Sequence, residues 1–327
     1  MTWGASLRDN VPEIKVRRAV NIEMPQKKRN QHHVWQHYLK SWATDGQIFC
    51  LRNDKIFSTG TTVVAVEKDF YKLHKITPKD LKLIHWLASE KAHPVNRKLH
   101  EQFLAGMAAP IIRFGHLTKT DKVIEQALDT FMTNALEDVY AGIEGRFIPL
   151  LARIKAGDMT FYTDDNDALE FIYFACTQYM RTKAIRVRII ERLKQHGLPD
   201  LTHVWNLMGY LYAVNIGFGL YLERKSRKLV LVENDTGIPF VTGDQPVTNL
   251  LGNGKTGPEE LVLYYPITPR LALILGEANK EPPFTSSDIT PSRVADLNAR
   301  IVAASHSQIF SCSEASLVQL LEQAQNH

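Results

Sequence analysis

Three histidines stand close together near the start of the chain, at His32, His33 and His37. Imidazole titrates near neutral pH and binds transition metals through a free ring nitrogen, so these side chains could serve as a general base or as metal ligands. His33 and His37 share one face if this stretch is helical. No HExxH pattern or second Cys/His cluster with metal-ligand spacing accompanies them. A structural or surface role is therefore the commoner alternative.

A second polar group follows an apolar run, in Thr242-Gly243-Asp244-Gln245-Pro246. Functional sites are often built where a strand ends in a tight turn, so Asp244 is a candidate catalytic carboxylate or a ligand of a divalent metal together with His32 and His33. The alternative is an Asx turn in which Asp244 caps its own loop. We expect Gln245, like Gln36 and Tyr38 of the histidine stretch, to contact substrate or to hold the fold.

Charged residues on two predicted helices complete the candidate site. Glu137 and Glu144 are seven residues apart and lie on one helix face. There they could bind a divalent cation or form an ion pair with a cationic side chain of another helix. Arg181 and Gln178 lie on the next helix among apolar residues. Because an arginine beside an apolar helix face usually pairs with a carboxylate, an internal ion pair of Arg181 is the alternative to substrate binding.

Hydrophobic periodicity divides the chain into strand-bearing ends and a helical middle at about 78–224. Near the N-terminus, 47–52 and 56–59 predict a β-hairpin, whereas 228–312 is rich in short apolar runs separated by turn residues. Within the middle, the pattern predicts long helices, listed with their expected bounds as 78–104 with a break near Ala92-His93, 121–154, 167–195 and 201–222.

These elements predict a single α+β domain over 31–327, preceded by a polar lead-in at 1–30. Neither end has enough strands to bury two sheet faces, so we expect the N-terminal hairpin to join the C-terminal strands in a mixed or antiparallel sheet packed against about four long helices. That topology would bring 31–42 close to 240–248.

Composition limits the class of protein. A hydrophobic content of 44% and a net charge of +4 describe a globular chain without a polycationic surface. The three cysteines are far apart and form no CxxC pair, which favours a reducing, cytoplasmic setting. The uncharged stretch 201–222 contains His, Asn and Gly, so it predicts a core helix, with no membrane as a partner. The sequence contains no Walker A, GxGxxG or GxSxG pattern, so it does not predict a nucleotide cofactor or a serine hydrolase.

The stretch from His32 to Trp42 resembles the opening motif of a bacterial family known as domain of unknown function 4238. The similarity continues in 66–71, 178–182 and 239–247, followed by 265–269 and 296–298, and spans about 30–312. Trp35 stands where that family usually has Pro, and Lys183 where Pro often follows the Arg-Thr pair. The resemblance implies that these blocks lie together in the fold, and it carries no activity.

Two hypotheses of function follow. The first is a hydrolase, specifically a metal-assisted phosphodiesterase or nuclease, with His32, His33, Glu144, Arg181 and Asp244 in its site and a nucleic acid or small phosphodiester as substrate. The second is a non-catalytic recognition or regulatory protein that binds a protein partner and whose polar motifs are structural. A role in phage defence is compatible with such a family, but no residue argues for it. Substrate, metal identity and oligomeric state are not determined by the sequence.

Overall fold

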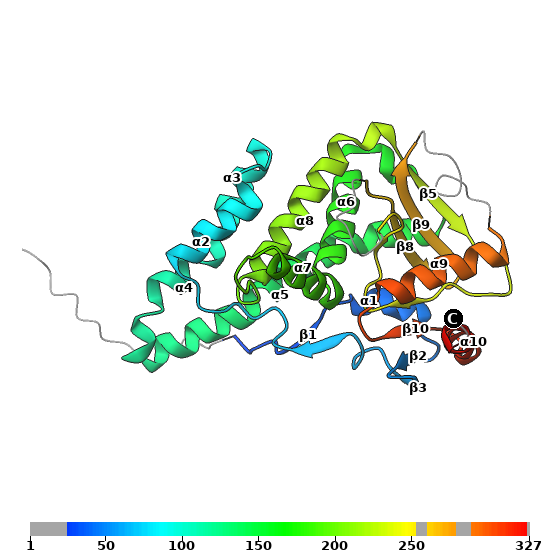
Figure 1. The fold of residues 1–327 in the computed structure, drawn as a ribbon, viewed down its shortest axis with the longest axis horizontal. Coiled ribbons are helices and arrows are strands. Elements are labelled where there is room, and N and C mark those ends of the chain that lie inside the picture. Colours follow the sequence, from blue (N-terminus) through cyan, green and yellow to red (C-terminus); the bar gives the residue numbers. More distant parts are fainter. Residues whose placement is uncertain (1–24, 253–259, 279–288, 326–327) are drawn as a thin grey trace, which may run out of the picture.

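The computed structural model describes residues 25–252, 260–278 and 289–325. Along the sequence, a helical middle separates two strand-containing ends, as predicted, and the two ends lie together in space (Figure 1). The helices of this middle are α2 Pro78–Ile84, a π-helical turn His85–Ser89, α3 Pro94–Met107, α4 Ala109–Phe114, α5 Lys122–Lys155, α6 Asp165–Met180, α7 Lys183–Gln195 and α8 Trp205–Leu222. The predicted α+β class is confirmed.

Local sequence signals explain where these helices begin. Thr77 and Asp80 form a reciprocal capping box at the start of α2, and the Asp121 carboxylate accepts hydrogen bonds from two backbone N–H groups at the start of α5. Pro94 is the first residue of α3, which confirms the predicted break before it. α8 is largely buried, as expected of the 201–222 stretch. Among the described residues, no helix is both long and apolar enough to span a membrane.

The prediction of one continuous helix over 167–195 is wrong, because the helix is interrupted between α6 and α7. α6 ends at Met180 with Arg181 as its C-cap, and Thr182 is extended with φ −79° and ψ 159°. The Thr182 hydroxyl donates to the Gln245 side-chain oxygen, a contact that a continuous helix would not place there. Lys183 then becomes the first residue of α7, a position at which proline is also well tolerated.

The strands form antiparallel sheets, and the hairpin joins C-terminal strands as predicted. The described residues form three sheets. The first pairs β1 Asn30–His32 with β4 Val66–Lys68, and the second has the order β3 Lys55–Gly60, β2 Gln47–Arg52, β10 Ile309–Ser311, β6 Thr242–Gly243. The third has the order β5 Arg227–Glu233, β9 Leu271–Glu277, β8 Leu263–Thr268, β7 Thr248–Asn249. The ladders are thus divided among sheets, where one sheet was expected. Asn53 and Asp54 adopt positive φ (53° and 57°) in the hairpin turn, as the short reversal between β2 and β3 requires.

Short helix α1 Gln36–Leu39 joins the two ends of the chain. The predicted apolar stripe of Val34, Tyr38 and Trp42 is confirmed, since all three side chains are fully buried. The Tyr38 hydroxyl lies 2.7 Å from the Thr242 hydroxyl and donates to the Pro266 carbonyl at 2.6 Å. The expected proximity of 31–42 to 240–248 is therefore present. Helices α9 Pro291–Ala304 and α10 Glu314–Gln325 complete this end (Figure 1).

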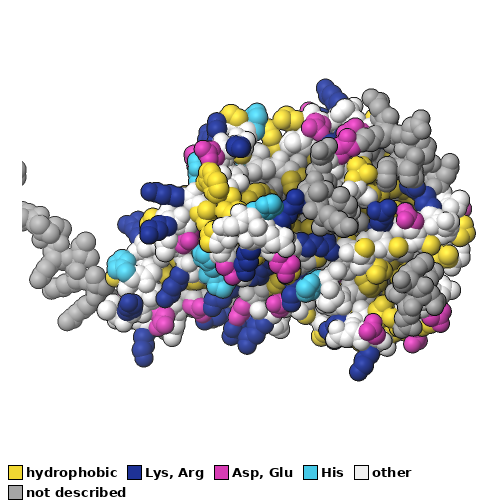
Figure 2. Space-filling view, in the orientation of Figure 1, with side chains coloured by type: hydrophobic (Ala, Val, Ile, Leu, Met, Phe, Trp, Pro, Cys, Tyr) yellow, Lys and Arg dark blue, Asp and Glu magenta, His cyan; other side chains and the backbone are white. Residues whose placement is uncertain are grey.

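The described part of the predicted lead-in runs along α5. The backbone N–H of Lys28 donates to the Asn134 side chain at 2.8 Å, and that side chain donates to the Gln26 carbonyl at 2.9 Å. The rest of the lead-in, 1–24, lies outside the described residues. In the space-filling view, Lys and Arg side chains alternate with Asp and Glu, in keeping with the small net charge (Figure 2).

Candidate functional site

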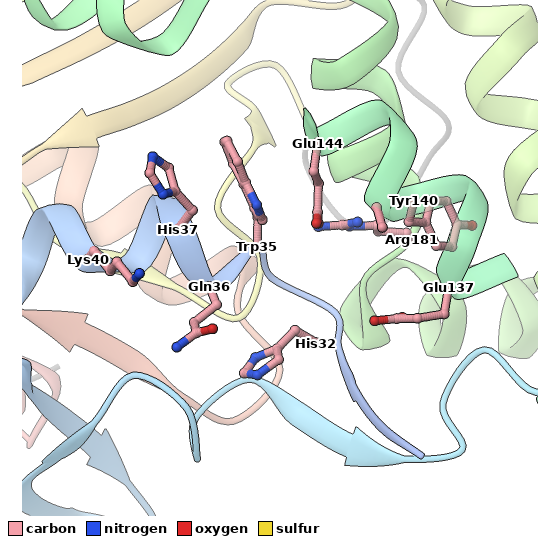
Figure 3. Close-up of a pocket in the computed structure, with 10 residues that line it drawn as sticks. His32, Trp35, Gln36, His37, Lys40, Glu137, Tyr140, Glu144 and Arg181 are labelled. Atoms are coloured by element: carbon pink, nitrogen blue, oxygen red, sulfur yellow. The ribbon is translucent and has the colours of Figure 1, made fainter. Parts of the chain in front are cut away.

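A pocket of about 240 Å³ lies where the segment around α1 meets α5 and the end of α6 (Figure 3). It is lined by His32, Trp35, Gln36, His37, Lys40, Glu137, Tyr140, Ala141, Glu144 and Arg181. Its residues include four that were predicted from the sequence as site residues, namely His32, Gln36, Glu144 and Arg181. The seven-residue spacing of the two glutamates puts both on the face of α5 that borders the pocket.

Gln178 fixes the backbone that carries the histidines. Its amide nitrogen donates to the His33 carbonyl at 3.0 Å, and its side-chain oxygen accepts from the Trp35 backbone N–H at 3.4 Å. Gln31 does the same on the α5 side, where it donates to the Thr133 carbonyl and accepts from the Tyr71 backbone N–H. Both amides are buried and bonded to backbone, so Gln178 positions the pocket wall and does not face a ligand.

Arg181 is the buried cation of the site. Its Nη2 donates to Glu144 Oε1 at 2.5 Å and to Gln178 Oε1 at 2.8 Å, while its guanidinium lies 5.3 Å from the centre of the Tyr140 ring. Burial by itself lowers the pKa of Arg181, but Tyr71 and the Glu144 carboxylate more than reverse this, so the pKa is raised and the charge is permanent. The predicted internal ion pair of Arg181 is confirmed.

The guanidinium retains unused donors. Within the described ranges, no hydrogen-bond acceptor contacts Nε or Nη1 of Arg181, and Nε is fully buried. Arginine has five N–H donors in a planar fork that suits carboxylate and phosphate oxygens. Arg181 therefore keeps donor capacity beside the pocket after its bonds to Glu144 and Gln178 are made.

Glu137 is the other carboxylate that lines the pocket. No hydrogen bond or ion pair to its side chain occurs in the part of the chain that the structure describes, and Figure 3 shows it reaching from α5 toward the side of the pocket where His32 lies. Burial raises its pKa to about 7, an effect that the nearby Arg181 charge partly offsets and Glu144 reinforces. The group thus titrates near neutral pH, as a proton-transferring carboxylate needs to.

His32 and His37 line the pocket as uncharged imidazoles. Burial lowers the pKa of His32, helped by the Arg181 charge, and burial with Lys155 and Lys40 nearby lowers that of His37. His33 lies apart from this lining. It is 3% exposed, its ring packs 5.1 Å from that of Phe70, and burial lowers its pKa to about 3. The predicted helical face shared by His33 and His37 is wrong, because α1 begins only at Gln36, after a non-helical Trp35.

Asp244 directly follows strand β6 and does not line the pocket. The residue is 1% exposed, and its carboxylate accepts from the backbone N–H groups of His306, Ser307 and Gln308 at 2.6 to 3.1 Å, and from the Ser307 hydroxyl at 3.1 Å. The structure thus favours a turn-capping role, although the partners come from a loop 62 to 64 residues away and not from its own turn. Among the described residues, no three His, Cys, Asp or Glu side chains are grouped as a metal ion would need.

Gln245 and Tyr38 are also held by inter-element bonds. The Gln245 amide donates to the Val247 and Tyr179 carbonyls at 2.6 and 3.2 Å and accepts from Thr182, so it fixes the break between α6 and α7. Sequence reasoning weighed His37 and Glu137 as possible ligands but left both out of the proposed catalytic set, and it missed Trp35, Lys40 and Tyr140 as lining residues. The spacing of Glu137, Tyr140 and Glu144 on α5 was the signal that could have found Glu137 and Tyr140.

The raised pKa of Glu137 predicts a pH-dependent stability. The folded chain holds this proton more tightly (pKa about 7) than an unfolded chain with the ordinary value of 4.5. Its stabilising contribution is complete below pH ~4.5 and is lost as the pH rises through ~7. We expect Glu137→Gln to gain stability relative to wild type between about pH 5 and pH 8, measured by urea unfolding.

Asp138→Asn is the matched control, because Asp138 is the next residue of α5 and forms an exposed ion pair with Lys28. We expect its stability difference from wild type to stay flat over the same pH range. Parallel profiles for wild type and Glu137→Gln would contradict the raised pKa.

A family model described as "Protein of unknown function (DUF4238)" matches residues 30–204 and 211–315 of the chain. The match includes every residue that lines the pocket, and it confirms the resemblance seen in the sequence motifs. The chain matches no curated protein and no solved structure.

Proposed function

For this chain, which belongs to the DUF4238 family of unknown function, we propose a hydrolytic function. The pocket supports hydrolysis of a small phosphodiester with Glu137 as the proton acceptor. The observation that carries the proposal is the Glu137 carboxylate, which has no partner among the described residues and a pKa of about 7, beside the partly used donor set of Arg181. A general base of this pKa is about half ionised at neutral pH, close to the optimum for catalysis.

The proposed reaction uses the groups of the pocket as follows. The free donors of Arg181, with the exposed Lys40 at the rim, attract the phosphate oxygens and stabilise the charge that grows on them. Glu137 accepts a proton as a water molecule attacks phosphorus. The ester bond breaks, the leaving oxygen takes a proton from water, and protonated Glu137 gives its proton to the hydroxide that remains, which restores the base. The neutral His32 and His37 offer hydrogen bonds without repelling either cation.

The size of the pocket supports a small substrate over a nucleic-acid duplex. Its volume of about 240 Å³ is just below the range of sites for drug-sized ligands, about 300–1,000 Å³. Proton transfer is assigned to Glu137 and not to a metal-bound water because the described residues lack a three-ligand group. Asp244 and His33 are left out of this reaction, since neither lines the pocket.

Hydrolysis of bis(4-nitrophenyl) phosphate by the purified chain, with a chelator present, tests the proposal. We expect Glu137→Gln to lower kcat/KM by at least about 100-fold, the usual contribution of a positioned general base. The wild-type kcat/KM should rise with pH through a midpoint near 7. Asp138→Asn should retain wild-type activity. No turnover by wild type, or equal turnover by Glu137→Gln, would reject the hydrolase, and activity that needs a metal would reject this form of it.

A recognition protein without turnover is the second candidate. Support comes from Gln31, Tyr38 and Gln178, whose polar groups are used inside the fold, and from the Glu144 carboxylate that already neutralises Arg181. Binding of dimethyl phosphate that is seen by NMR and lost in Arg181→Met, without hydrolysis of any phosphodiester, would favour this alternative.

A further inference from the structure

A second cavity, separate from the pocket around Glu137, lies between α3, α5, α6 and α8. Its volume is about 440 Å³, within the range of small-molecule sites. Its walls are mainly apolar or aromatic, and they include Leu99, Phe103, Tyr173, Tyr210, Val214 and Phe218. Leu99 is 47% exposed, so the cavity has an apolar rim, and Figure 2 shows hydrophobic side chains exposed over the α2–α3 end of the molecule.

The charges around this cavity cancel. Arg146 and Glu170 line it and form an ion pair at 3.0 Å. His100 also lines it, with Nδ1 2.9 Å from the Ser89 hydroxyl, and burial lowers its pKa so that it is neutral at pH 7. An ionic ligand would therefore lose its hydration without gaining an unpaired opposite charge, which favours an uncharged occupant.

Two tyrosines give the cavity one unused donor. The hydroxyl oxygens of Tyr173 and Tyr210 are 2.5 Å apart, and the Phe103 ring stacks on Tyr210 at 4.0 Å between centroids. The two hydroxyls carry two protons, and their mutual hydrogen bond uses one. No other hydrogen bond of either hydroxyl occurs in the part of the chain that the structure describes, so one O–H remains to be donated.

We propose that this cavity binds an uncharged, mainly apolar aromatic molecule with one acceptor oxygen, which takes the free hydrogen of the Tyr173–Tyr210 pair. The aromatic walls offer ring contacts, and an apolar cavity of this size favours an apolar guest over water. The acceptor oxygen distinguishes the ligand class from a plain hydrocarbon. This site is independent of the proposed hydrolysis at Glu137.

Calorimetric titration of the full chain with 2-acetylnaphthalene, 2-ethylnaphthalene and 2-naphthoate tests the proposal. We expect saturable 1:1 binding of the ketone, about 3- to 10-fold tighter than the ethyl compound because of one hydrogen bond, and weakest binding of the anion. No saturable binding of the ketone, or tightest binding of 2-naphthoate, would overturn it.

Variants locate the site. Leu99→Trp should weaken ketone binding at least about 10-fold by filling the rim, and a half-exposed position tolerates the larger side chain. The double variant Tyr173→Phe with Tyr210→Phe should lower ketone affinity to that of the ethyl compound. Tyr162→Phe, a partly buried tyrosine outside the cavity lining, is the matched control and should bind like wild type. Unchanged ketone binding in both Leu99→Trp and the double variant would refute the site.

Discussion

Asp244→Ala is expected to lower the free energy of unfolding by roughly 3–5 kcal/mol, as measured by urea denaturation. The buried carboxylate accepts from three successive backbone N–H groups and the Ser307 hydroxyl. Hydrogen bonds to a charged group contribute about 1.5–3 kcal/mol each, and alanine would leave the donors of 306–308 without an acceptor. Burial raises the Asp244 pKa, and these hydrogen bonds oppose that rise.

Two controls separate the structural role of Asp244 from a catalytic one. Asp244→Asn keeps one acceptor oxygen, so its loss of stability should be smaller, and Asp235→Ala at an exposed position should change stability by less than about 0.5 kcal/mol. Any loss of hydrolysis in Asp244→Asn should follow the fraction of folded protein. A fully folded, inactive Asp244→Asn would restore the catalytic hypothesis.

Arg181→Met is expected to cost about 3–5 kcal/mol of stability, because it leaves the partly buried Glu144 carboxylate without its donor and removes the shorter of two hydrogen bonds to the Gln178 oxygen. It should also raise the Glu137 pKa further above 7, since the Arg181 charge now lowers it. Urea unfolding measures the first effect, and NMR titration of the Glu137 carboxyl carbon measures the second.

Arg146→Met is the matched control for Arg181, because it removes an arginine whose ion pair with Glu170 is exposed. We expect a cost below about 1 kcal/mol for it. A double-mutant cycle of Arg181→Met with Glu144→Gln should give a coupling above about 1 kcal/mol. Coupling near zero, or an unchanged Glu137 pKa in Arg181→Met, would contradict the arrangement described for this pair.

Local sequence patterns predicted the structure correctly where the contacts that determine it lie within a few residues. The helix starts at Thr77 and Asp121 follow capping rules within one turn, and the Asn53-Asp54 turn follows from the positive φ that these residues tolerate. The break at Thr182 was missed because the contact made there is with the distant Gln245 side chain. Apolar periodicity continues across the break and gives no signal of it.

The sequence by itself determined the α+β class, the buried stripe of Val34, Tyr38 and Trp42, and the single face of α5 that carries Glu137 and Glu144. Only the tertiary structure decided which polar side chains remain available for chemistry. Asp244 is hydrogen-bonded to a residue 62 positions away, and Gln178 to one 145 positions away. Glu137 is left without a partner among the described residues. Residue spacing fixes the direction of a side chain on its own helix or strand, but satisfaction of a buried polar group depends on which distant segment the fold brings to it.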